Sequence, residues 1–139
     1  LSGADLSEAS LVYTKLVGAD LSQARYDGKT KFPDGFDYRN QRAVGPESNL
    51  RYANLKGADL RKARLNGVNL RGADLSESDL READLSGTNL TGASLTGAKL
   101  RGANLTNADL SDANLTNIKY NHKTVFPPHI TPPPSRKDS

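Results

Sequence analysis

Leucine recurs at every fifth position in two blocks of this chain, and that period limits the possible folds more than any other feature. The leucines run in steps of five from Leu1 to Leu21 and again from Leu50 to Leu115, and all 19 fall in these two registers. Tyr26 and Tyr120 take the same place at the end of each block. A period of five fits neither an α-helix, at about 3.6 residues per turn, nor a straight strand, at about two. The chain must therefore turn once in every repeat.

Small residues and glycines give each repeat a side and a corner. Alanine stands two positions before most leucines, as at Ala58 and Ala73. Because residues two apart on an extended segment share a face, Ala-x-Leu is predicted to point both ends inward. Glycine often stands two positions after the leucine, as at Gly57 and Gly97, where a type II turn needs a positive φ. Each pentapeptide is thus one short wall and one turn.

Repeats such as Ala58–Lys62 and Ala108–Asp112 resemble the A(D/N)LXX signature of pentapeptide-repeat proteins. The resemblance covers residues 1–28 and 48–122. It implies an all-β fold, a right-handed quadrilateral β-helix with four pentapeptides per coil and about five stacked coils. The inward leucines of successive coils should stack into buried columns. One such column consists of Leu55, Leu75 and Leu95.

Composition is consistent with such a solenoid but names no partner. Only 35% of the residues are apolar and there is no Trp, Met or Cys, which alone would suggest disorder. A solenoid of this kind needs only two inward positions in five. The 19 basic and 16 acidic side chains nearly cancel, so charge selects no class of partner. No apolar run approaches the roughly 18 residues of a membrane-spanning helix, so no membrane insertion is expected.

The stretch between the two leucine blocks breaks the register. Tyr26 and Leu50 are 24 positions apart, which is not a multiple of five. Residues 29–47, which include Pro33 and Pro46, are therefore predicted to leave the coil as a loop ejected at one corner. The two blocks should still form one solenoid over residues 1–126, because six pentapeptides are too few to be stable alone.

One short pattern occurs twice, once at the end of each block. Residues 26–33 align with residues 120–127 and share Tyr, Lys, Thr, Phe and Pro at equal spacing. The pattern resembles an ending common in cyanobacterial-type pentapeptide-repeat proteins, where Phe-Pro folds back over the open coil. The first copy is either an old terminus kept inside a fused array or the turn that any departing chain needs. The four aromatic residues are predicted to be packing plugs: Tyr26, Phe32, Tyr120 and Phe126.

The proline-rich tail, residues 127–139, should be extended or disordered and should protect the last coil from pairing with another chain. The first coil has no such guard in this sequence. We therefore expect a monomer or an end-to-end dimer through the N-terminal coil. Because Leu1 opens in mid-pattern, a natural segment is expected to precede it. The cytoplasm is favoured, with the periplasm or thylakoid lumen as alternatives if a signal was removed.

Two groups of side chains are candidates for an interaction surface. Residues 20 apart share a face, so Arg61, Arg81 and Arg101 should form a column that could hold a carboxylate or phosphate group. The alternative is that neighbouring aspartates and glutamates neutralise this column. The second group is aromatic and lies in or beside the predicted loop. It consists of Phe36, Tyr38 and Tyr52, and its alternative role is packing against the wall.

No catalytic, cofactor-binding or metal-binding set is predicted. The two histidines, His122 and His129, lie in the tail without cysteines or an organised carboxylate set. The serines and threonines of the repeats have no positioned base beside them, as a nucleophile would need. We therefore expect no enzyme, no cofactor and no small-molecule substrate.

A non-enzymatic protein-interaction scaffold is the predicted function, since a packed narrow interior leaves only faces and a loop for contact. The alternative is the topoisomerase-modulating role of some pentapeptide-repeat proteins, which resemble DNA in width and negative charge. Residues 50–120 hold ten basic and eight acidic groups, which disfavours that mimicry. Nucleic-acid binding is disfavoured because no stacking aromatics line the basic column.

Overall fold

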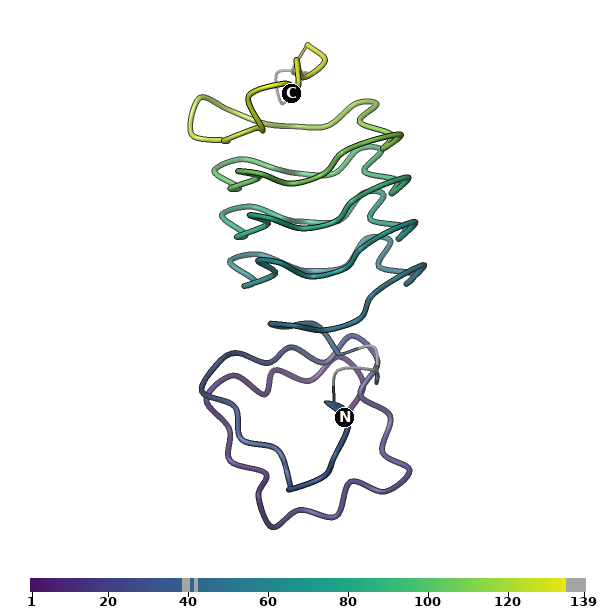
Figure 1. The fold of residues 1–139 in the computed structure, drawn as a ribbon, viewed down its shortest axis with the longest axis vertical. Helices are drawn as coiled ribbons and strands as arrows, with labels where there is room; N and C mark the ends of the chain where they lie inside the picture. Colours follow the sequence, from purple (N-terminus) through teal and green to yellow (C-terminus); the bar gives the residue numbers. More distant parts are fainter. Residues whose placement is uncertain (39–40, 42, 135–139) are drawn as a thin grey trace.

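The computed structural model describes residues 1–38, 41 and 43–134. Its extended segments are single-residue parallel bridges rather than longer strands, and the described residues contain no α-helix. From Asn49 onward each bridge joins residues 20 apart, as in the series Asn49, Asn69, Asn89 and Asp109, except the last, between Asn104 and Val125, which joins residues 21 apart. Four such columns of bridges run side by side, so each coil has four sides. Figure 1 shows these coils stacked one above another.

Each corner is a tight turn closed by the backbone. In the repeat around Leu55, the N–H of Ala58 donates to the carbonyl oxygen of Leu55 at 3.0 Å, and Gly57 between them has a φ of 66°. Polar residues occupy other corners in the same left-handed conformation, for example Glu77 at 59° and Asn107 at 58°. The prediction of one side and one corner per pentapeptide is thus confirmed. The corners accept glycine without requiring it.

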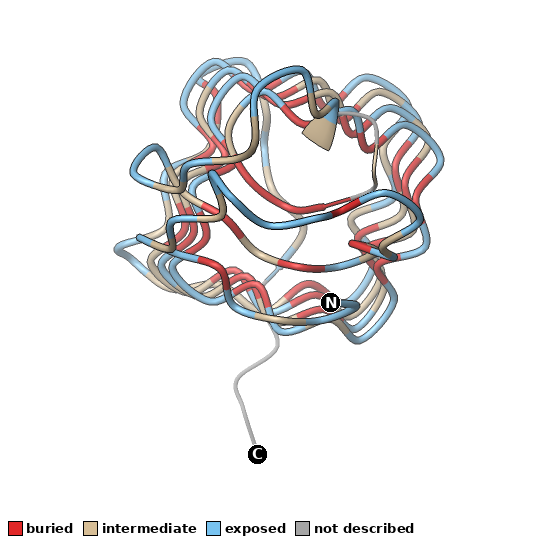
Figure 2. Ribbon diagram, turned by 90° about the horizontal axis from the view of Figure 1, so that it is seen from below, coloured by how far each residue is buried: buried red, intermediate tan, exposed pale blue. Residues whose placement is uncertain are grey.

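The leucine columns form the core. Leu55 is 1% exposed, and Leu75 and Leu95 are completely buried, as predicted. Figure 2, viewed from below along the axis of the stack, shows buried segments alternating with exposed corners around the wall. The small residue two positions earlier is buried beside them, but it is not always apolar. Ser78 takes an alanine position, is completely buried, and its hydroxyl has no hydrogen-bond partner.

The range predicted for the loop, residues 29–47, includes residues at both ends that belong to the wall. Lys31 forms a parallel bridge with Ser10, and Val44 forms one with Arg25, so both lie in the wall. The bridge at Lys31 spans 21 residues instead of 20. The turn after Tyr26 takes up the extra residue. Positions 39, 40 and 42 of the predicted loop lie outside the described residues.

The bridges divide the described chain into an N-terminal unit, residues 1–44, and a C-terminal unit, residues 49–126. No described residue of one unit forms a β-bridge with the other. Each unit has its own apolar cluster, although Val44 packs into the cluster of the C-terminal unit. Figure 1 shows the N-terminal unit, purple to blue, at one end of the stack with its coil inclined to the others.

Where the two units meet, hydrogen bonds donated by side chains replace the backbone hydrogen bonds that join coils elsewhere. Gln23 donates from Nε2 to the carbonyl oxygen of Asn54 at 3.3 Å. Arg25 donates from Nη2 to the carbonyl oxygen of Arg61 at 2.8 Å. These contacts define the seam, the boundary between the N-terminal and C-terminal units.

The repeated pattern at residues 26–33 and 120–127 builds the same structure twice. The rings of Tyr26 and Phe32 meet edge to face at 5.5 Å and 83°, and those of Tyr120 and Phe126 do so at 5.1 Å and 84°. The second copy also takes a 21-residue step, since Val125 bridges to residue 104. The predicted packing role of these aromatics agrees with their contacts to the two apolar clusters.

A threonine ties each copy of the pattern to the coil before it. Thr30 donates its hydroxyl to the carbonyl oxygen of Leu6 at 2.9 Å, and Thr124 donates to that of Leu100 at 2.8 Å. The threonine that the two copies share thus makes the same hydrogen bond in each. Pro127, the last residue of the second copy, is buried, and Ile130 beyond it packs against the C-terminal cluster. The start of the proline-rich tail therefore belongs to the folded end.

Candidate interaction surfaces

The predicted arginine column is largely neutralised. Arg61 donates from Nε and Nη2 to the two carboxylate oxygens of Asp59 at 2.8 and 2.6 Å, and Arg81 binds Asp79 with the same distances. These hydrogen bonds hold the pKa of Asp79 below its usual range. The column is therefore not a row of free guanidinium groups. Two of its three arginines are occupied by the aspartate two positions earlier.

A different pair of arginines surrounds the exposed aromatic residue that the sequence singled out. Tyr52 is 66% exposed, and the guanidinium carbon of Arg51 lies 5.7 Å from the centre of its ring. Hydrogen bonding to Arg51, together with the charge and hydrogen bonding of Arg71, lowers the pKa of the Tyr52 phenol. We call these three residues the Arg51–Tyr52–Arg71 patch.

Backbone and glycine hold Tyr52 in place. Its N–H donates to the carbonyl oxygen of Arg71 at 2.9 Å. Its ring lies against Gly72 one coil further on, where a Cβ atom would come within 2.5 Å of the ring carbons Cδ1 and Cε1. Only glycine at position 72 leaves room for this ring position. Tyr52 is thus an exposed aromatic with a fixed orientation.

The arginines of this patch have no carboxylate partner in the part of the chain that the structure describes. Their repeats, residues 48–52 and 68–72, contain no acidic residue. Arg51 and Arg71 were not among the predicted site residues, although their 20-residue spacing in two repeats without an acidic residue was a usable signal.

The aromatics of the insertion pack inward. Phe36 and Tyr38 are partly buried against the N-terminal cluster. The ring of Phe32 stacks on Tyr38 at 4.4 Å and 10°, and on Phe36 at 6.0 Å and 29°. Their contacts match the alternative that the sequence analysis kept open, packing against the wall.

An apolar surface lies on the N-terminal unit. Tyr13 and Val17 are fully exposed and Val12 is 37% exposed, at outward positions that carry mostly polar residues elsewhere. A groove of about 440 Å³ runs beside Val17 and Phe36.

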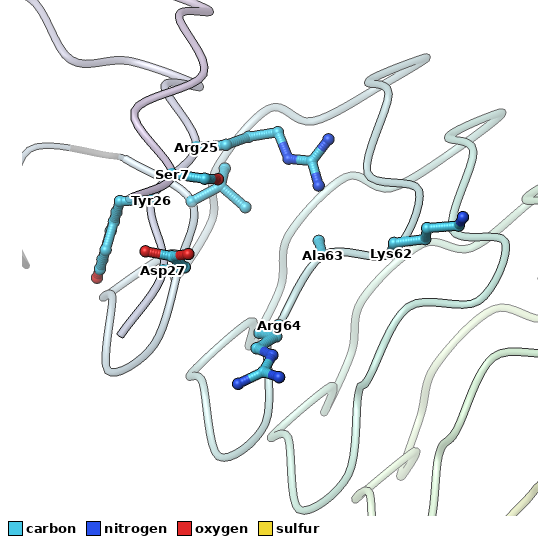
Figure 3. A pocket seen from close by; sticks show the side chains of 8 residues that line it. Ser7, Arg25, Tyr26, Asp27, Lys62, Ala63 and Arg64 are labelled. Carbon is cyan, nitrogen blue, oxygen red and sulfur yellow. The ribbon is translucent and has the colours of Figure 1, made fainter. Parts of the chain in front are cut away.

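A polar cavity lies at the seam. It has a volume of about 140 Å³ and is lined from the N-terminal unit by Arg25 and Asp27 and from the C-terminal unit by Ala63 and Arg64, among others. Figure 3 shows Arg25 reaching across the seam, while Lys62 extends away from it. Its Nζ atom instead lies 3.8 Å from Oε2 of Glu82.

No metal or membrane site emerges from the described residues. They contain no group of three or more His, Cys, Asp or Glu side chains placed to hold an ion. Over the same part of the chain, no helix has the length and apolar character needed to cross a bilayer.

The comparison with protein families decides the classification. The model for pentapeptide repeats matches residues 1–25, 47–77 and 78–117, in 8 copies. The chain belongs to the pentapeptide repeat family. Pentapeptide repeat proteins form right-handed β-helices, so the predicted fold class is confirmed at that level. No curated protein matches this pentapeptide repeat chain.

Solved structures of pentapeptide repeat proteins resemble this one. A protein from the thylakoid lumen of Arabidopsis thaliana is 32% identical, with a TM-score of 0.56, over 90% of this chain and 67% of its own. A protein from Nostoc PCC 7120 is 31% identical over 60% of this chain and 77% of its own, with a TM-score of 0.30. Another, from Cyanothece 51142, is 26% identical over 90% of this chain and 89% of its own, with a TM-score of 0.31.

Proposed function

We propose that this pentapeptide repeat protein is a non-enzymatic scaffold that binds an acidic segment of a partner protein through the Arg51–Tyr52–Arg71 patch. The observation that carries the proposal is an aromatic side chain, 66% exposed, held between two arginines that have no carboxylate partner among the described residues. Tyrosine and arginine are the residue types enriched at the energetic centres of protein interfaces.

The fixed position of Tyr52 favours binding. Its contact with Gly72 and its backbone hydrogen bond already order the ring, so less side-chain entropy is lost on association. Arginine can bind a carboxylate with two parallel hydrogen bonds, and Arg61 and Arg81 make that contact within this molecule. Arg51 and Arg71 are available to make the same contact with a carboxylate of another protein.

A scaffold also fits the rest of the molecule. Leucines fill the interior of the C-terminal unit, and the described residues hold no group of three or more His, Cys, Asp or Glu side chains placed to bind a metal ion. We further propose that residues 1–126 act as one solenoid of about five coils. Val44 supports this arrangement, because it bridges to Arg25 while packing into the C-terminal cluster.

Affinity capture with matched variants tests the proposal. The full chain is used as bait in extract of the source cell beside the triple variant Arg51→Ala, Tyr52→Ala, Arg71→Ala. The control triple variant Tyr13→Ala, Lys15→Ala, Lys123→Ala removes one tyrosine and two cations elsewhere on the surface. We expect a protein that the wild type and the control capture but the patch variant does not.

Reconstitution with the purified captured protein makes the test quantitative. The patch variant should bind it at least about tenfold more weakly, a loss of ~1.4 kcal/mol. Gly72→Ala should weaken binding too, because a Cβ atom would displace the Tyr52 ring. Equal capture by the patch and control variants would show that the partner contacts another surface.

A further inference from the structure

We propose that the cavity at the seam binds a phosphate-class oxyanion between Arg25 of the N-terminal unit and Arg64 of the C-terminal unit. This inference is independent of the Arg51–Tyr52–Arg71 patch. The proposed ligand lies at the seam, where the column of β-bridges of the C-terminal unit ends.

The first observation is the pair of guanidinium groups. Both Arg25 and Arg64 line the cavity, and neither forms an ion pair with a carboxylate in the described chain. Arg25 uses Nη2 for the carbonyl oxygen of Arg61, which leaves its other N–H groups for a ligand. Guanidinium groups bind phosphate oxygens in pairs, with geometry that a point charge lacks.

The second observation is an unpaired backbone donor. On the next coils, the N–H of Asp84 donates to the carbonyl oxygen of Ala63, and the N–H of Asn104 donates to that of Ala83, each at 2.9 Å. Within the described residues, the N–H of Arg64 has no such acceptor. The cause is the pairing of Val44 with Arg25, which leaves no coil in register below Arg64. A free N–H on an arginine that lines a cavity together with a second arginine is suited to an anion.

The carboxylate in the cavity does not take the ligand's place. Asp27 accepts hydrogen bonds at its Oδ1 from the N–H groups of Glu8, Lys29 and Thr30, each at 3.0 Å. These bonds tie it to its own turn. The lining therefore keeps a net positive charge even with the Asp27 carboxylate ionised.

The size of the cavity limits the ligand. Its volume of about 140 Å³ is close to the ~150 Å³ of a cavity that holds one benzene molecule. A single phosphate or sulfate fits within this volume. An anion bound here would contact both units and would hold them together.

Phosphate binding to the full chain tests the inference. The protein is exchanged into a chloride buffer, and inorganic phosphate is titrated while ionic strength is kept constant. We expect saturable broadening of the phosphate ³¹P resonance and a rise of the unfolding temperature with phosphate concentration, because the anion binds only the folded state. Arg64→Gln should weaken binding at least about tenfold, the effect of losing a charged hydrogen bond.

The controls separate the site from general charge effects. Lys15→Gln with Lys123→Gln removes two cations that do not line the cavity and should leave phosphate binding unchanged. Arg25→Gln should weaken binding as well, and circular dichroism checks its fold because Arg25 also contacts Arg61. Absence of binding, or equal binding by Arg64→Gln and the wild type, would overturn the proposal. O-phosphoserine, titrated in parallel, distinguishes the ligand's source: tighter binding than phosphate indicates a phosphoryl group carried by another molecule, and weaker binding a free ion.

Discussion

The phenol hydroxyl of Tyr120 donates a hydrogen bond to the carbonyl oxygen of Pro133 at 2.7 Å, and so fastens the proline-rich segment over the last coil. Tyr26 makes the equivalent contact with the carbonyl oxygen of Pro46 at 2.5 Å. In both copies of the repeated pattern, the tyrosine that replaces leucine therefore packs with its ring and anchors a later segment with its hydroxyl.

Tyr120→Phe should loosen that cover without disturbing the coils. Loss of the hydroxyl should lower the free energy of unfolding by about 1 kcal/mol, the net contribution of one hydrogen bond. Limited proteolysis should cut residues 127–134 faster, while urea unfolding measures the change in stability. An unchanged cleavage rate in this segment would mean that the hydrogen bond does not hold it.

Ser78→Ala should stabilise the protein by about 1 kcal/mol. The Ser78 hydroxyl is buried without a hydrogen-bond partner, and its removal relieves the cost of that burial. Thr88→Ala provides the contrast, because the Thr88 hydroxyl donates to the carbonyl oxygen of Leu85 at 2.7 Å. This second variant should be destabilised. Urea unfolding of both checks the signs, and a destabilised Ser78→Ala would contradict the prediction.

Arg81→Ala should destabilise the protein more than Arg61→Ala. Both arginines bind an aspartate, but the side chain of Asp79 is 17% exposed and that of Asp59 is 55% exposed. Removing Arg81 leaves the more buried carboxylate without its counter-ion. The urea midpoints of the two variants, measured side by side, should differ in that order. The reverse order would mean that burial of the aspartate does not set the cost.

Stability should fall in acid. A serine two positions later donates to Asp74 and to Asp109, and this lowers the pKa of each carboxyl below 3.8. The unfolded state therefore binds protons more readily, so the stabilisation is complete above about pH 4 and is lost as pH falls through the folded pKa values. Urea midpoints at pH 7 and pH 3 measure this loss.

Asparagine substitution isolates the titration. Asn54 and Asn114 stand in the same column as Asp74, and their Oδ1 atoms accept the backbone N–H two positions later at 3.2 and 3.0 Å. Asp74→Asn with Asp109→Asn should therefore keep the turns and reduce the difference between the two midpoints. An undiminished difference would place the acid sensitivity on other groups.

Unfolding should be a single transition if the two units form one solenoid. Circular dichroism and tyrosine fluorescence should then give coincident urea curves. A variant lacking residues 33–38 would be a poor test, because Phe36 and Tyr38 belong to the packing of the N-terminal unit. Proteolysis that removes residues 1–44 while the C-terminal unit survives would instead show two independent units.

The repeating wall could be predicted from sequence because each repeat solves the same local problem. The leucines of the inner coils are buried, so their period alone placed Leu75 in the core. The ends of the insertion could not be placed in this way. Lys31 stays in the wall despite an extra residue, because the turn stabilised by Asp27 absorbs it. From the spacing alone, one extra residue in the turn is read as the point where the chain leaves the coil.

The surface was harder to predict because the leucine period says nothing about the residue that sits beside each arginine. Arg61 and Arg51 look alike in sequence, each following an inward leucine. The residue before the leucine is Asp59 in one repeat and Asn49 in the other, so only Arg61 has a carboxylate two positions away. This single difference separates a neutralised column from an available patch.

The interruption at the seam also affects how the molecule would respond to force. Between the coils of the C-terminal unit, a pull along the stack is resisted by several backbone hydrogen bonds on each coil, as at Leu75 and Glu77. At the seam, the carbonyl oxygens of Asn54 and Arg61 accept hydrogen bonds from the side chains of Gln23 and Arg25. Under tension the coils would therefore part there first, before the leucine columns of the C-terminal unit were exposed. The protein has a built-in point of mechanical yield.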